Sequence, residues 1–173
     1  MLIFLQMIET EEDKSKFEEI YEEYRKLMYY LAVKRLKNGE DAEDAVHQVF
    51  VRIAERIRVI EPAGPKTKRL VVVMIENAVT DMLRKRARRP GEEYREEELA
   101  SPAPEIGEKD LLDQCLWKLP EKQRMVVWLK YHDGYSLREI AGLLGISLFW
   151  AQKLDQRAKN LLAELYLEGG GSL

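Results

Sequence analysis

The chain has 173 residues, of which 46% are apolar and 34% are charged, and its formal net charge is −3. This composition permits a buried core and argues against membrane insertion, because no run approaches the roughly 18 apolar residues of a spanning helix. The opening MLIFLQMIE lacks a basic leader and a small-residue cleavage site, so we predict a cytoplasmic protein without a signal peptide.

Three helices are predicted in the N-terminal part, since apolar residues recur there at spacings of three and four. The first carries an apolar stripe over residues 17–36 and is ended by the turn NGED. The second has Asp41 as its predicted N-cap and an apolar face over residues 42–57. After the loop EPAGP, the third helix is predicted to begin near Lys66 or Thr67 and to run into the basic cluster RKRARRP.

Charge is strongly segregated along the chain. Residues 66–89 carry eight basic and two acidic side chains, whereas residues 92–108 carry one basic and seven acidic side chains. The local surplus of six positive charges is the electrostatic footprint of a phosphate-binding strip, with a solvated helix face as the alternative interpretation. The acidic segment contains proline and glycine and has almost no apolar periodicity, which predicts a linker.

The chain is therefore predicted to be all-α, with two small helical domains joined by an acidic linker that contains proline and glycine. The first domain is expected over residues 1–91 and the linker over residues 92–108. The second domain is expected over residues 109–167, followed by a flexible tail at residues 168–173.

The second domain opens with two further predicted helices. DLLDQCLWKL reads as an amphipathic helix, and the spacing of Cys115 with its leucines favours a buried position over a reactive thiol. Because this cysteine is single, an internal disulfide is excluded. Pro120 is predicted to open the next helix as a first-turn proline, and EKQRMVVWLKYH continues that helix.

The clearest local signal is the segment DGYSLREIAGLLGIS. Ser136 and Glu139 are spaced as a capping box, and Gly145 supplies a tight turn. Ser147 then caps a helix predicted to run to about Leu167. Two helices joined by a short glycine turn form a helix-turn-helix, which binds DNA in many proteins, although helical hairpins used only for packing look similar.

These segments together resemble the sigma factors of bacterial RNA polymerase, specifically the small two-domain extracytoplasmic-function (ECF) type, over about residues 16–165. DAEDAVHQVFVRI resembles the family's polymerase-docking helix, IENAVTDMLRKRARR its −10 segment, and LPEKQRMVVWLKYHDGYSLREIAGLLGIS its −35-binding domain. The resemblance implies a transcription initiation factor that is not an enzyme. Its implied partners are promoter DNA and core RNA polymerase, contacted at the β′ clamp helices and the β flap.

Asp44, His47 and Gln48 project from the polar side of the second predicted helix. The resemblance implies that these three residues contact the β′ clamp helices. Where the family usually has Gln and then Glu, this chain has His47 and then Gln48, which removes one negative charge. The alternative is an ordinary solvated helix face.

The −10 candidates follow the third predicted helix into the basic cluster: Asn77, Asp81, Arg84, Lys85, Arg88 and Arg89. Amides and carboxylates can pair with base edges, whereas the cations hold phosphates. The resemblance implies that Asn77 captures an unstacked −10 base and that the four basic residues anchor the strand. Alternatively, Asn77 or Asp81 makes a local structural hydrogen bond. The tryptophan that the family often carries before this helix is Leu70 here, so aromatic base stacking is not expected from this segment.

The −35 candidates lie in the helix-turn-helix: Arg138, Phe149, Trp150, Gln152, Lys153 and Gln156. Glutamine suits adenine edges, and lysine suits guanine or phosphate. The family commonly has Gly-Thr at the positions of Phe149 and Trp150 and buries leucine at Asp155, so its −35 preference is not carried over. Three explanations for the two aromatics stay open: packing as core against the preceding helix or Tyr135, contact with thymine methyls, and contact with another protein.

No cluster of His and Cys has metal-ligand spacing, so neither a metal nor a cofactor is expected. By the resemblance, an anti-sigma protein is a further candidate partner, and the expected location is the nucleoid. Two other function classes are considered. A stand-alone helix-turn-helix regulator would leave the polar surface of residues 44–48 unexplained, and a polymerase-binding protein with little DNA reading would not need the positive strip of residues 66–89.

Overall fold

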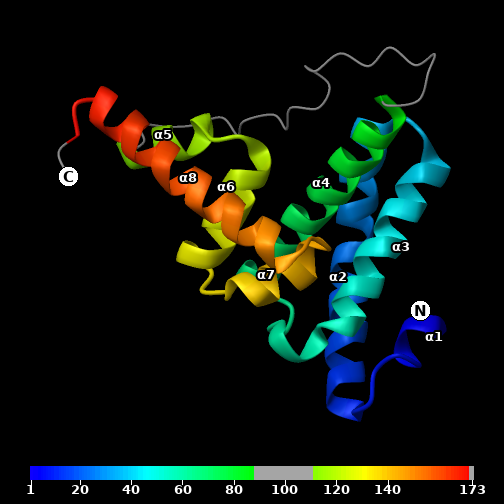
Figure 1. Cartoon of the computed structure of the whole chain (residues 1–173). Coiled ribbons are helices and arrows are strands. Elements are labelled where there is room, and N and C mark those ends of the chain that lie inside the picture. The colour runs from blue at the N-terminus through cyan, green and yellow to red at the C-terminus, as the bar shows by residue number, and fades with distance from the viewer. Residues whose placement is uncertain (88–110, 172–173) are drawn as a thin grey trace. The chain divides into compact units, whose positions relative to one another are not determined.

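The computed structural model describes residues 1–87 and 111–171. All regular elements within these residues are helices, which confirms the predicted all-α class. They form two compact units, one mainly from residues 1–87 and one mainly from residues 111–171 (Figure 1). The predicted linker lies outside the described residues, so the domain boundaries stay a prediction. No helix within residues 1–87 and 111–171 is long and apolar enough to cross a membrane.

Three long helices make up most of the first unit: α2 (Glu11–Leu36), α3 (Gly39–Glu55) and α4 (Pro65–Ala87). These three helices pack against one another, and the short α1 (Leu2–Leu5) lies against α3 (Figure 1). The 3-10 turn η1 (Ile57–Val59) comes directly after α3 in the chain. The apolar stripes predicted from periodicity meet in one core. Its largest fully buried side chains include Phe17, Phe50, Ile20, Met28, Ile53, Leu70, Met74 and Ile75.

The turn between α2 and α3 is shorter than NGED suggested. Lys37 follows α2 with a left-handed φ of 55°, and α3 already begins at Gly39. The N-cap is Asn38, whose side-chain oxygen accepts a hydrogen bond from the backbone N–H of Asp41 at 3.1 Å. The prediction of Asp41 as N-cap is therefore wrong, because the cap is set by where α2 stops. Asp41 instead forms an ion pair with Arg86 near the end of α4.

The loop before α4 is held by two hydroxyl groups. The backbone N–H of Gly64 donates to the Tyr24 hydroxyl at 2.8 Å, and this hydroxyl donates to the Gly64 carbonyl at 3.1 Å. The Thr67 hydroxyl donates to the carbonyl of Pro62 at 2.8 Å. With these polar groups satisfied, α4 begins at Pro65, one residue before the predicted start, in the first-turn position that suits proline.

The second unit packs two helices, α5 (Leu111–Lys118) and α6 (Glu121–Val127), against the long α8 (Leu148–Glu168) (Figure 1). Cys115 of α5 is buried and free, as predicted. One cluster of its core consists of Leu119, Val127 and Ala158, with Leu116, Leu161 and Leu162 packed against it.

The helix predicted over EKQRMVVWLKYH changes its winding midway. Pro120 is the N-cap of α6 and not a first-turn residue, a shift of one position. After α6 ends, Trp128–His132 form a π-helical turn, η3, in which the backbone N–H of Asp133 bonds the carbonyl of Trp128 at 3.1 Å. A π turn takes more residues per rotation than an α-helix, so the side chains within it point in directions that α-helical spacing does not predict.

The predicted capping box is confirmed at the start of α7 (Leu137–Leu144). The backbone N–H of Glu139 donates to the Ser136 hydroxyl oxygen at 3.2 Å. In return, the backbone N–H of Ser136 donates to the Glu139 carboxylate at 2.8 Å. Both N–H groups lie at the start of the helix, where they have no acceptor within the helix itself. Two residues three apart in sequence satisfy both donors and so define where this helix begins.

The turn between α7 and α8 also follows the prediction. Gly145 has a φ of 65°, and the backbone N–H of Ile146 bonds the carbonyl of Ala141 at 2.9 Å, which is the glycine-dependent helix ending expected here. Ser147 then caps α8, since its hydroxyl accepts a hydrogen bond from the backbone N–H of Trp150 at 3.1 Å. The two helices and this turn form the predicted helix-turn-helix.

Candidate functional site

Asp44, His47 and Gln48 are all exposed on α3, and we name these three residues the docking surface. The opposite side of the helix is buried by Ala42, Ala45, Val46, Val49, Phe50 and Ile53. The polar face predicted from periodicity is therefore accessible to a partner. Sequence analysis missed one neighbour of this surface: the ring of Phe4 in α1 lies 5.1 Å from the ring of His47, between centroids. The apolar run at the start of the chain was the available signal for that contact.

The −10 candidates differ in accessibility. Arg84 and Lys85 are exposed near the end of α4, whereas Asp81 is half-buried and Asn77 is buried. The cations can therefore reach a phosphate backbone from this helix, while capture of a base by Asn77 stays a prediction. The other two candidates, Arg88 and Arg89, lie outside the described residues.

All six −35 candidates are exposed: Arg138, Phe149, Trp150, Gln152, Lys153 and Gln156. Phe149 is 65% exposed and Trp150 is 38% exposed, so the explanation that they pack as core is wrong. The reason is helical geometry. The buried seam of α8 begins at Ala151, and Phe149 lies two residues or about 200° around the helix from it.

Two cations lie over these aromatic rings. The Lys153 ammonium is 5.5 Å from the centroid of the Phe149 ring, and the Arg157 guanidinium is 5.5 Å from that of Trp150. Such cation–π contacts favour one side-chain position over many, so the exposed edge of α8 presents apolar and positive groups together. Arg157 was missed by sequence analysis, although its spacing of seven residues from Trp150 places both on one helix face.

Asp155 is not part of this exposed edge, because it is only 4% exposed. Its Oδ2 accepts a hydrogen bond from Lys130 Nζ of the π turn at 2.7 Å and lies 3.5 Å from Lys159 Nζ. Burial would raise the pKa of Asp155, but the hydrogen bond from Lys130 and the two positive charges hold that pKa below its usual value. The carboxylate at the position of a family leucine is thus a charged contact between η3 and α8.

The part of the chain that the structure describes contains no group of three or more His, Cys, Asp or Glu side chains that could hold a metal ion.

Two family models match the chain: sigma-70 region 2 over residues 20–89 and sigma-70 region 4 over residues 109–148. Together they cover more than half of it. The first match contains the docking surface and the basic end of α4. The second contains α7 and the turn but ends at Leu148, so it stops where the two exposed aromatics begin.

Similar full-length proteins agree with these matches. The chain is 28% identical over 169 residues to the ECF RNA polymerase sigma factor SigW of Bacillus subtilis, with 87% of this chain and 88% of that protein covered. It is 26% identical over 164 residues to the ECF RNA polymerase sigma factor SigM of Mycobacterium tuberculosis, with 91% of this chain and 82% of that protein covered.

Proposed function

We propose that this chain, which belongs to the ECF type of the sigma-70 family of RNA polymerase sigma factors, divides promoter recognition between its two units. It is a transcription initiation factor that directs RNA polymerase to promoters. The observation that carries the division is the order of the two matches: region 2 over the docking surface and the basic end of α4, and region 4 over the helix-turn-helix.

In the first unit, the docking surface binds the clamp helices of the β′ subunit, and the basic end of α4 holds the −10 strand. The exposure of the docking surface supports the first role, and the exposure of Arg84 and Lys85 supports the second. Phosphate contacts of this kind position a strand and carry no sequence information, so the candidates for base choice at −10 are Asp81, which is half-buried, and Asn77. Because Asn77 is buried, this role requires its amide to become accessible when the chain binds DNA.

In the second unit, α8 enters the major groove at the −35 element, and the unit contacts the β flap. Gln152 and Gln156 are one turn apart on the exposed edge of α8, a spacing that allows both to reach base edges. Phe149 and Trp150 contact thymine methyl groups, and the neighbouring Lys153 and Arg157 hold phosphates. Contact of the aromatics with another protein is the alternative.

The family assignment also supports three broader roles. The chain does not itself catalyse a reaction, it is located at the nucleoid in the cytoplasm, and its activity is inhibited by an anti-sigma protein.

Run-off transcription tests the proposed function. Purified core polymerase is combined with the chain and a library of genomic fragments, and promoter-dependent transcripts are expected only when both proteins are present. A stand-alone regulator would bind duplex DNA without polymerase, and a polymerase-binding protein that does not read DNA would bind core without yielding transcripts. Either result would reject the proposal.

Replacing Phe149 by alanine is expected to weaken binding of the polymerase complex to −35 duplexes by about tenfold, since an apolar base contact worth about 1.4 kcal/mol is lost. The thermal midpoint should not change, because the side chain is 65% exposed. Fluorescence titration with duplexes selected by the wild-type complex gives the affinity. Trp150→Ala is the companion variant, and Leu167→Ala, which removes an exposed side chain far along α8, is the control. Unchanged DNA affinity with both aromatic variants would favour another protein as their partner.

A further inference from the structure

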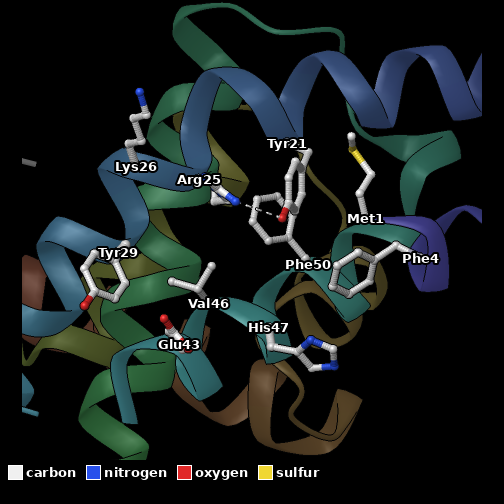
Figure 2. Close-up of a pocket in the computed structure, with 10 residues that line it drawn as sticks. All are labelled: Met1, Phe4, Tyr21, Arg25, Lys26, Tyr29, Glu43, Val46, His47 and Phe50. Carbon is white, nitrogen blue, oxygen red and sulfur yellow. Dashed lines mark hydrogen bonds between the residues drawn. The ribbon is translucent and has the colours of Figure 1, made fainter. Parts of the chain in front are cut away.

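A cavity of about 550 Å³ opens in the first unit between α1, α2 and α3. Its inner wall is aromatic, with Phe4, Tyr21 and Phe50, and its rim carries Arg25 of α2 and His47 of α3 (Figure 2). A cavity of this size and lining accepts an apolar side chain of a partner and offers polar groups where that partner emerges.

Phe4 is the buried side chain of the short helix α1 and anchors it beside this cavity. Phe4 is 5% exposed, and its ring centroid lies 5.6 Å from that of Phe17 and 5.9 Å from that of Phe50. Its neighbours in the same helix do not share this burial: Leu2 is 78% exposed and Ile3 is 69% exposed. The structure therefore holds α1 in place while leaving two neighbouring large aliphatic side chains exposed, where contact with a partner would remove them from water.

The helix α1 lies next to the docking surface through its buried residue, Phe4. His47 belongs to the docking surface and also lines the cavity, and its ring lies 5.1 Å from the ring of Phe4 (Figure 2). A partner that covers His47 is thus in reach of the cavity and of α1. This continuity selects the polymerase as the occupant over a partner that would bind α1 alone.

The positive charge of Arg25 at the rim of the cavity favours a partner that carries a negative charge. The Arg25 guanidinium lies 5.6 Å from the centroid of the Tyr21 ring, and its Nη1 donates a hydrogen bond to the Tyr21 hydroxyl at 3.5 Å (Figure 2). The arginine is exposed, so it is held at the rim with its charge accessible. A carboxylate in the partner next to the inserted apolar side chain would pair with it.

We propose that α1 and this cavity extend the docking surface, so that core polymerase inserts an apolar side chain into the cavity and also contacts Leu2 and Ile3 on the exposed part of α1. A carboxylate of the polymerase beside that side chain pairs with Arg25. The inference rests on the proposed role of the docking surface, and it adds an apolar contact to a surface that is otherwise polar.

The test is the affinity of the full-length Leu2→Ser/Ile3→Ser variant for core polymerase, measured by fluorescence titration. We expect about tenfold weakening, because the contact of two aliphatic side chains with the partner removes apolar surface from water, and an unchanged thermal midpoint, because both side chains are exposed in the free chain. The matched control is Leu112→Ser/Leu167→Ser, which removes two aliphatic side chains that are 48% and 50% exposed in the second unit. Arg25→Glu should weaken binding as well, and more strongly at low salt.

The outcomes separate the two proposals. If Leu2→Ser/Ile3→Ser binds within about twofold of the wild type while Asp44→Lys binds poorly, the inference is wrong and the docking surface stands. If neither variant loses affinity, both proposals are wrong. Sedimentation of the free chain tests the remaining occupant: a dimer that the double serine variant converts to a monomer would assign α1 to a second copy and overturn the inference.

Discussion

Asp44→Lys is expected to lower the affinity for core polymerase by about 30-fold, which corresponds to about 2 kcal/mol. The substitution places a positive charge at a position of the docking surface where the wild-type carboxylate is exposed. We expect Asp44 to pair with a cation of the polymerase. The lysine of the variant would then repel that cation, so the substitution costs more than the loss of one attraction. The effect should shrink as salt is added, since the charges are accessible to solvent ions.

The control for this prediction is Glu164→Lys, which makes the same change of charge at an exposed position of α8 in the second unit. It should leave the affinity for core polymerase unaltered, and both variants should keep the wild-type thermal midpoint. Equal affinities of the Asp44 and Glu164 variants would remove the docking surface from the polymerase contact. The measurement is a titration of labelled chain with core polymerase at two salt concentrations.

Lys130→Met is expected to reduce the free energy of unfolding by about 2 kcal/mol, because it removes the charged hydrogen-bond donor that lies 2.7 Å from the buried carboxylate of Asp155. The cost is smaller than for a fully buried pair, since Lys130 is partly exposed and Lys159 stays within 3.5 Å of the carboxylate. The double variant Lys130→Met/Asp155→Leu should recover most of the loss, because an apolar pair of similar volume needs no counter-charge.

Urea denaturation of the wild type, the two single variants and the double variant forms a double-mutant cycle. It measures the coupling free energy between Lys130 and Asp155. Lys159→Met serves as the control, since its longer contact is expected to contribute little. A double variant no more stable than Lys130→Met would show that Asp155 is not the reason for the loss.

The contribution of this pair should depend on pH in a defined direction. The folded pKa of Asp155 is held below its ordinary value of 3.8, so the carboxylate stabilises the fold above about pH 4, and this is lost as pH falls through the lowered pKa. The hydrogen bond to Asp155 raises the pKa of Lys130 above 10.5, so its contribution is lost only as pH rises through that higher value. The stability difference between wild type and Lys130→Met should therefore be constant near neutrality and vanish in acid.

Local signals in the sequence were sufficient for several features. The capping box of Ser136 and Glu139 involves residues three apart, and the exposed face of α3 follows from helical periodicity, so neither needs knowledge of distant contacts. The choice of Asn38 over Asp41 as N-cap needed more, because both residue types cap helices well and only the end of α2 decides between them.

By itself, the sequence determined the all-α class, the positions of the main helices and the helix-turn-helix, since these depend on periodicity, caps and turns within a few residues. Only the tertiary structure decided that the side chains of Phe149 and Trp150 are exposed and that the side chain of Asp155 is buried. The physical reason is that burial depends on what covers each side chain. The π turn carrying Lys130 covers Asp155 with a counter-charge, while the first turn of α8 directs Phe149 away from the buried seam.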